Sequence, residues 1–176
     1  MRIGPLWVGP PWEQPPAEAV AVVIDPGRAF GTGAHATTRL CLELLLESAT
    51  GGLLDVGCGS GVIGIAAAKL GFGPIVAVDV DPAAVEAAVL NAAANAVELE
   101  VRLADALGGA ALPPVELAVA NITLGAVEHV ARVLECDRLV SSGYLAADEP
   151  RLAGFTRLRR VEREGWAADL SARQTG

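Results

Sequence analysis

The residues best suited to bind a small molecule form a glycine-rich stretch at 53–64. It reads Leu-Leu-Asp-Val-Gly-Cys-Gly-Ser-Gly-Val-Ile-Gly and leads into an alanine-rich segment. This order predicts a strand, a tight turn and the start of a helix. Glycine permits turn angles that a Cβ forbids, and the unpaired N–H groups of a helix start favour electronegative ligand atoms. The stretch therefore predicts a nucleotide-type site that includes Gly57, Gly59 and Gly61.

An acidic residue closes the next apolar run. Asp79 ends the run 75–79 and stands at the carboxyl end of the expected strand. A carboxylate there can accept hydrogen bonds from both ribose hydroxyls of a bound nucleoside. Asp81 precedes Pro82, an order typical of a helix cap and first turn. We therefore interpret Asp79 as the ligand residue and Asp81 as the structural one.

Two more polar residues follow expected strands. Asp105 comes after the run 99–103, and Asn121 comes after the run 115–120. Ligands of open α/β sheets gather at the carboxyl ends of strands. Asp105 can bond an adenine amino group or be an ordinary loop acid. Asn121 can accept a hydrogen bond from an incoming substrate group or cap the helix that follows.

The loop at 25–35 opens with the turn signal Asp-Pro-Gly and holds further glycines. A loop of this kind acts as a lid over a neighbouring ligand site or is a plain surface connection. Thr37 or Thr38 is expected to cap a helix that runs to about Ser48, and the other threonine can reach a ligand. We expect His35 to order the loop through a hydrogen bond, because no partner adjacent in sequence would make it a base.

Two cofactors fit glycines followed by a distal acid: a nicotinamide dinucleotide and S-adenosylmethionine. Asp55 stands before the glycines, where a dinucleotide fingerprint usually has an apolar residue. About fifty residues precede the first core strand and can cover a methionine tail. No second catalytic domain follows, although most dehydrogenases need one. These features favour S-adenosylmethionine.

The elements that must position these residues alternate between strands and helices, which predicts one doubly wound α/β sheet. Continuous apolar runs indicate parallel strands buried on both faces. Gly143 and Tyr144 are expected to end the fifth core strand, and the last two strands form a hairpin. The expected strands are 19–24, 53–56, 75–79, 99–103, 115–120, 138–142, 157–164 and 166–173. The expected helices after the loop are 37–48, 62–70, 82–96, 123–134 and a short proline-interrupted piece at 148–155.

Residues 1–18 form a proline-rich arm ahead of the domain expected at 19–176. Prolines exclude a long helix there. Trp7 and Trp12 interrupt the prolines, so the arm is either an extended segment docked by its tryptophans or a remnant of a linker.

Composition limits the class of protein. The 176 residues are 52% hydrophobic and 19% charged, which predicts one globular domain. The formal net charge of −8 disfavours binding to nucleic-acid backbones and favours a basic partner. No apolar run is long enough to span a bilayer, and no signal-peptide pattern opens the chain.

The cysteines suggest neither a disulfide framework nor a metal site. Cys41, Cys58 and Cys136 are odd in number and lack metal-ligand spacing, so we expect reduced thiols in a cytoplasmic protein. Cys58 lies in the glycine turn without a visible base, and we interpret it as a small packing residue.

Several stretches together resemble a known family. The glycine turn with Asp79 is similar to the first two motifs of class I S-adenosylmethionine-dependent methyltransferases. From about residue 5 to the C-terminus the chain resembles the ribosomal protein L11 lysine methyltransferases, and the loop Phe-Gly-Thr-Gly-x-His followed by Thr-Thr is the specific part. The stretches that carry the resemblance are 7–12, 25–35, 37–42, 55–61, 79–82 and 119–122.

The resemblance implies a bacterial cytoplasmic enzyme. It would transfer methyl groups from S-adenosylmethionine to lysine and N-terminal amines of a large-subunit ribosomal protein. It also implies a seven-stranded, mostly parallel Rossmann-like sheet with a C-terminal antiparallel hairpin. Thr38, Gly57, Asp79 and Asn121 occupy the family's cofactor-binding positions, and we expect Phe30 to join them. Asn121 is the expected catalytic residue, and no metal is expected.

The sequence departs from the expected pattern in two respects. The residues after Asn121 read Ile-Thr-Leu-Gly and not the Pro-Pro-Tyr run of many amine methyltransferases, although this family lacks that run as well. The family has an N-terminal substrate-recognition domain ahead of the arm, and we expect that domain to be absent or encoded elsewhere. The alternatives are a methyltransferase for another protein or a small molecule, a cofactor-binding remnant without activity, and a nicotinamide-dependent reductase. A monomer or a dimer is expected.

Overall fold

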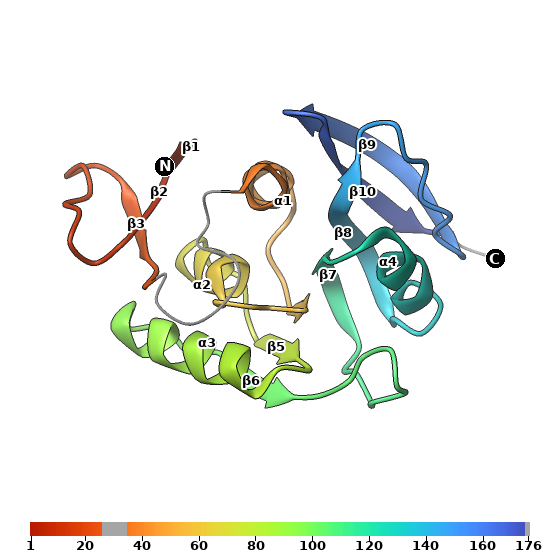
Figure 1. Ribbon diagram of the computed structural model, residues 1–176, viewed down its shortest axis with the longest axis horizontal. Coiled ribbons are helices and arrows are strands. Elements are labelled where there is room, and N and C mark those ends of the chain that lie inside the picture. The colour runs from red at the N-terminus through yellow and green to blue at the C-terminus, as the bar shows by residue number, and fades with distance from the viewer. Residues whose placement is uncertain (26–34, 175–176) are drawn as a thin grey trace.

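The computed structural model of the chain describes residues 1–25 and 35–174. A seven-stranded sheet in the order β6-β5-β4-β7-β8-β10-β9 forms its centre (Figure 1). The first five strands of this order are parallel, and β8-β10 and β10-β9 are antiparallel pairs. The predicted sheet with its C-terminal hairpin is confirmed. The strands are β4 (Leu53–Val56), β5 (Ile75–Asp79), β6 (Glu100–Leu103), β7 (Val115–Asn121), β8 (Cys136–Leu145), β9 (Phe155–Arg163) and β10 (Trp166–Arg173).

Helices cover both faces of this sheet. The faces differ because successive strand residues point to opposite sides: Leu53 packs with residues of α1 and α2, whereas Leu54 packs with residues of α4. All four residues of β4 are buried, as a central parallel strand requires. The helices are α1 (Ala36–Leu46), α2 (Val62–Lys69), α3 (Pro82–Ala94) and α4 (Leu124–Val130). None of the helices in the described part of the chain is long and apolar enough to cross a membrane.

The N-terminal arm and the strand that follows it form a second, three-stranded sheet. It contains β1 (Arg2–Ile3), β2 (Leu6–Gly9) and β3 (Val20–Val23). The expected strand at 19–24 therefore exists but lies outside the main sheet. Trp7 is buried and Trp12 is 70% exposed, so only one of the two tryptophans docks the arm.

Two expectations about the C-terminal half are wrong. No helix forms at 148–155, where turns connect β8 to β9. The side chain of Arg160 donates to the carbonyls of Ala146 and Asp148 and so holds this connection in an irregular path. Strand β8 also continues through Gly143 and Tyr144 to Leu145, because β10 pairs with it over this length.

Candidate functional site

The glycine stretch forms a tight bend between β4 and α2. The N–H groups of Gly57 and Cys58 donate to the carbonyl of Val78, at 2.9 and 3.1 Å, and so tie the bend to the end of β5. Gly57 has a φ of +70°, and a Cβ there would lie 2.4 Å from Cγ2 of Ile122. Glycine is therefore needed both for the backbone angle and for the contact with the residue that follows Asn121.

Asp79 lies against this bend. Its Oδ2 accepts from the N–H of Gly59 at 2.9 Å, and its Oδ1 accepts from the N–H of Asp81 at 3.0 Å. A carboxylate has about four lone-pair positions, so each oxygen can still accept a ligand hydroxyl. Asp81 caps α3 by accepting from the N–H of Ala83 at 2.9 Å, which confirms its structural role.

Asp55 lies beneath the bend and is almost fully buried. Its Oδ2 accepts from the N–H of Gly64, in the first turn of α2, at 3.0 Å. Loss of solvation raises the pKa of Asp55 to about 7, the hydrogen bond from Gly64 opposes that rise, and the nearby charge of Asp79 adds to it. The carboxyl group therefore joins strand and helix across the bend and titrates near neutrality.

Asn121 ends β7 on the other side of the bend and is half-buried. It lies beside Ser142 of β8 in the parallel register. The next residue of β8, Gly143, has a φ of +97°, and a Cβ there would lie 1.8 Å from the carbonyl oxygen of Ile122. Strand β8 therefore passes directly against the peptide that follows Asn121, which only glycine permits.

Behind Gly143, a buried polar network fixes the course of β8. The hydroxyl of Tyr144 lies 2.9 Å from Oγ of Ser141 and 3.0 Å from Oδ2 of Asp169. Burial raises the pKa of Asp169, and Arg160, whose guanidinium lies 3.5 Å away, opposes the rise. These contacts hold the strand next to Asn121 in one position.

The start of α1 lies at the same end of the sheet. The N-cap of α1 is His35, whose Nδ1 accepts from the N–H of Thr37, so the expected threonine cap is wrong. The ring of His35 also contacts the ring of Trp166 in β10, edge to face, with centroids 5.0 Å apart. Thr38 is 3% exposed and Cys41, one turn later, is fully buried, where α1 packs against β8.

The remaining predicted ligand residues are less closely gathered. Asp105 is exposed, and its Oδ1 accepts from the N–H groups of Leu107 and Gly108 in a local turn. The residue before Asp105 does contact Asp79: the N–H of Ala104 donates to the Asp79 carbonyl at 2.9 Å. The expected ligand role of Asp105 stays a prediction. Phe30 and the expected lid loop around it, at 26–34, lie outside the described residues.

The sequence reading missed two asparagines, Asn91 in α3 and Asn95 at its C-cap. The side chain of Asn91 donates to the carbonyl of Ser60 in the bend and accepts from the N–H of Asp25. Asn95 exchanges hydrogen bonds with both backbone groups of Val23 in β3. The available signal was a pair of asparagines one turn apart in an alanine-rich segment. Asparagine is a poor helix former, so two of them at this spacing suggest side chains that hydrogen-bond outside the helix.

Cysteine chemistry and metal binding gain no support. The three cysteines are free and buried, and burial raises the pKa of the Cys58 thiol, so it is a poor nucleophile at neutral pH. Among residues 1–25 and 35–174, no cluster of histidine, cysteine and acidic side chains is suited to hold a metal ion.

Comparisons with known sequences agree with one another. The model of the family described as ribosomal protein L11 methyltransferase (PrmA) matches residues 1–170. A ribosomal protein L11 methyltransferase of Methylococcus capsulatus is 42% identical over 192 residues, which cover 99% of this chain and 64% of that protein. One from Bordetella parapertussis is 44% identical over 161 residues, which cover 85% and 52%. The chain thus spans between about half and two thirds of the length of these curated relatives.

Solved structures share the fold. A ribosomal protein L11 methylase from Lactobacillus delbrueckii subsp. bulgaricus has a TM-score of 0.85 at 26% identity, covering 94% of this chain and 93% of that chain. The 16S rRNA methyltransferase RmtF, solved in complex with S-adenosyl-L-homocysteine, has a TM-score of 0.59 at 18% identity, covering 81% and 66%. The second likeness concerns the fold alone.

Proposed function

Because the chain belongs to the ribosomal protein L11 methyltransferase (PrmA) family, we propose that it transfers methyl groups from S-adenosylmethionine to amines of ribosomal protein L11. The proposed amines are lysine side chains and the N-terminus, and the proposed location is the cytoplasm. The substrate comes from the names of the curated relatives. This chain spans only part of their length, so activity and substrate both need a direct test.

The observation that carries the proposal is the contact between Asp79 and the glycine bend. The two carboxylate oxygens are held by the N–H groups of Gly59 and Asp81, which fixes them at the carboxyl ends of β4 and β5. Their free lone pairs suit the two hydroxyls of a ribose. The adenosyl part of S-adenosylmethionine carries such a sugar, so the residues fit this cofactor.

Bound at the bend, S-adenosylmethionine would supply an activated methyl group on a cationic sulfur. The remaining task of the chain is to place an amine lone pair in line with that methyl group. Asn121 ends the strand next to β4 and lies beside the contact between Gly57 and Ile122. We assign the positioning of the amine to the side-chain carbonyl of Asn121, which can accept a hydrogen bond from it.

The amine must be neutral to react, although a lysine amine has an ordinary pKa of about 10.4. Removal from water and a nearby positive charge both lower the pKa of an amine. Asn121 is half-buried at the end of β7, so an amine bonded to it leaves part of its water behind. This environment favours the neutral amine without a dedicated general base.

The proposal is tested with labelled S-adenosylmethionine, purified L11 and the variant Asn121→Ala. The wild-type chain should label L11. Asn121→Ala should lower turnover by roughly a hundredfold, the size of a lost positioning contact. Its affinity for the cofactor should stay within about threefold of wild type, because the Asp79 contact is unchanged.

Thr123→Ala is the matched control. Thr123 lies two residues from Asn121, is exposed and makes no side-chain cap bond to α4, so turnover and affinity should both persist. Equal losses of turnover and affinity in Asn121→Ala would contradict the positioning role. A wild-type chain that binds the cofactor but labels neither L11 nor any other protein of a ribosomal lysate would contradict the activity.

A further inference from the structure

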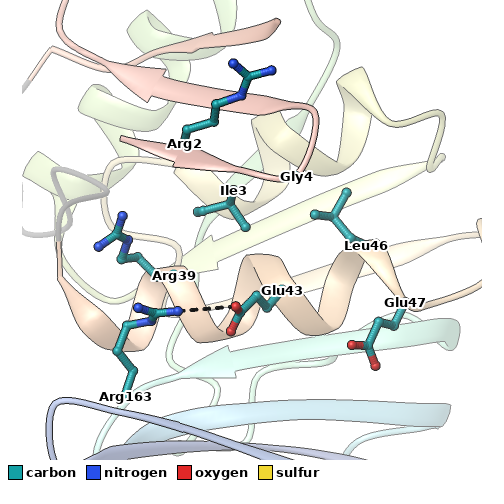
Figure 2. A pocket seen from close by; sticks show the side chains of 8 residues that line it. All are labelled: Arg2, Ile3, Gly4, Arg39, Glu43, Leu46, Glu47 and Arg163. Atoms are coloured by element: carbon teal, nitrogen blue, oxygen red, sulfur yellow. Dashed lines mark hydrogen bonds and ion pairs between the residues drawn. The ribbon is translucent and has the colours of Figure 1, made fainter.

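A small hollow lies beside the only polar stripe of α1 in the described structure. Most of α1 is buried, and the charged side chains of Arg39, Glu43 and the C-cap residue Glu47 follow one another at the spacing of a helical turn. Together with Ile3 of β1 and Arg163 of β9 they line a hollow of about 380 Å³ (Figure 2). The hollow lies between the small sheet, α1 and the edge of the main sheet.

The charges of this stripe are paired except at one end. Oε1 of Glu43 lies 3.4 Å from Nη2 of Arg163, and Oε2 of Glu47 lies 2.7 Å from Nε of Arg159. Arg39 is half-buried, and its guanidinium makes no ion pair or hydrogen bond with any residue in 1–25 or 35–174. Strand β9 ends at Arg163, and the next residue, Glu164, is exposed in the hairpin turn.

The unpaired end of the hollow is also the end nearest the proposed reaction site. Arg39 follows Thr38 directly, in the first turn of α1. Arg163 registers with Trp166, whose ring contacts His35 at the N-cap of α1. Figure 2 shows Arg39 and Arg163 together toward one end of the hollow, with Leu46 and Glu47 toward the other.

A half-buried guanidinium without a partner favours an anion, and its planar fork matches a carboxylate. The formal net charge of −8 disfavours a polyanion such as a nucleic-acid backbone. A single carboxylate on a peptide is repelled only weakly by the net negative charge of the chain. We propose that Arg39 binds a carboxylate of the protein substrate, so that the preferred acceptor amine stands next to an acidic residue. This inference depends on the proposed function for the identity of the bound protein.

The test uses two short fluorescent peptides with a single lysine, flanked by glutamates in one and by glutamines in the other. Binding by fluorescence anisotropy and methyl transfer from labelled S-adenosylmethionine are measured separately. The wild-type chain should prefer the glutamate peptide roughly threefold to fivefold at low salt, the size of one partly exposed ion pair. The preference should fall as salt is added.

Two variants and one control locate the preference. Arg39→Gln should abolish it, and Arg39→Lys should restore part of it because the charge returns without the fork. Arg102→Gln is the control, since Arg102 is a partly exposed arginine paired with Glu100 on β6, at the opposite edge of the sheet. It should keep the wild-type preference.

The outcomes separate this inference from the proposed function. A glutamate preference in binding that Arg39→Gln removes supports the inference even without methyl transfer, and the proposed function then fails alone. Equal binding and equal methylation of both peptides by the wild-type chain would overturn the inference and leave the function standing. A preference for the glutamate peptide that persists in Arg39→Gln would also overturn it. So would a preference that appears only where light scattering shows the protein chain to be a dimer.

Discussion

The two sides of the candidate site are built in different ways. On the bend side, Asp55, the glycines and Asp79 belong to one continuous strand–helix–strand segment, and their contacts are hydrogen bonds to main-chain N–H groups. On the Asn121 side, the contacts join α1, β7, β8 and β10, as between His35 and Trp166. One side is therefore fixed by a local motif, and the other by close approach between elements that are distant in sequence.

We expect the largest effect from a substitution at the closest contact on the Asn121 side, between Gly143 and the carbonyl of Ile122. In Gly143→Ala the new Cβ would overlap the Ile122 carbonyl at 1.8 Å and sit at a φ of +97°. We expect unfolding in urea to show a loss of roughly 3 kcal/mol, from strain together with the displaced peptide. Methyl transfer should fall by more than about tenfold, since Asn121 moves with that peptide.

A control separates overlap from backbone strain in this variant. Gly165 has a φ of +79° in the hairpin turn, with no atom close to its Cβ position. Gly165→Ala should lose only about 1 kcal/mol of stability and keep methyl transfer. If the two variants lost equal stability and activity, the close approach would not be what positions Asn121.

The next largest effect concerns Asp55 on the bend side, whose titration makes the free energy of unfolding depend on pH. Burial raises the pKa of Asp55 to about 7, so the folded chain holds a proton that the unfolded chain releases at lower pH. The stabilisation from this proton is complete below the ordinary pKa of the group and is lost as pH rises through about 7. Relative to Asp55→Asn, the wild-type free energy of unfolding should fall by about 2 kcal/mol between about pH 5 and about pH 7.

Asp55→Asn keeps an oxygen that can accept from the N–H of Gly64, so the comparison isolates the proton. Urea unfolding of both proteins across this pH range measures the difference. A difference that does not change with pH would mean that Asp55 is ionised throughout, and that the bend rests on a buried charge.

We expect the smallest effect from shortening Cys58, a buried side chain of the bend itself. Cys58 packs with Ala77 and Ala88, and burial raises the pKa of its thiol. Cys58→Ala should lower the free energy of unfolding by about 1 kcal/mol and leave turnover unchanged. A large loss of turnover at wild-type cofactor affinity would instead give the thiol a chemical role.

The bend side could be predicted from the sequence because each signal is local. Glycine spacing, an acid at a strand end and proline after Asp81 each act within a few residues. The helix cap shows the limit of such signals. Thr37 and Thr38 are both good caps by type, yet His35 takes the position, where its ring also contacts Trp166. That contact joins residues far apart in sequence, so no local sequence pattern predicts it.

Gly143 shows the same limit. In the sequence, Gly143 followed by Tyr144 indicates the end of a strand. The strand instead continues because β10 pairs with it, and the glycine serves the approach to Ile122. The expected helix at 148–155 fails for a related reason, since Arg160 of β9 holds two carbonyls of that connection. Tertiary partners decided these positions, and propensity did not.

The most direct test of the account is a calorimetric titration of S-adenosylmethionine and NAD against the wild-type chain, Asp79→Ala and Asp81→Ala. The wild-type chain should bind S-adenosylmethionine and not NAD. Asp79→Ala should bind roughly tenfold to a hundredfold more weakly, since ribose hydroxyls lose a charged acceptor. Asp81→Ala should lose about 1 kcal/mol of stability as a helix cap and keep its affinity. Binding of NAD in place of S-adenosylmethionine, or wild-type affinity in Asp79→Ala, would contradict the account.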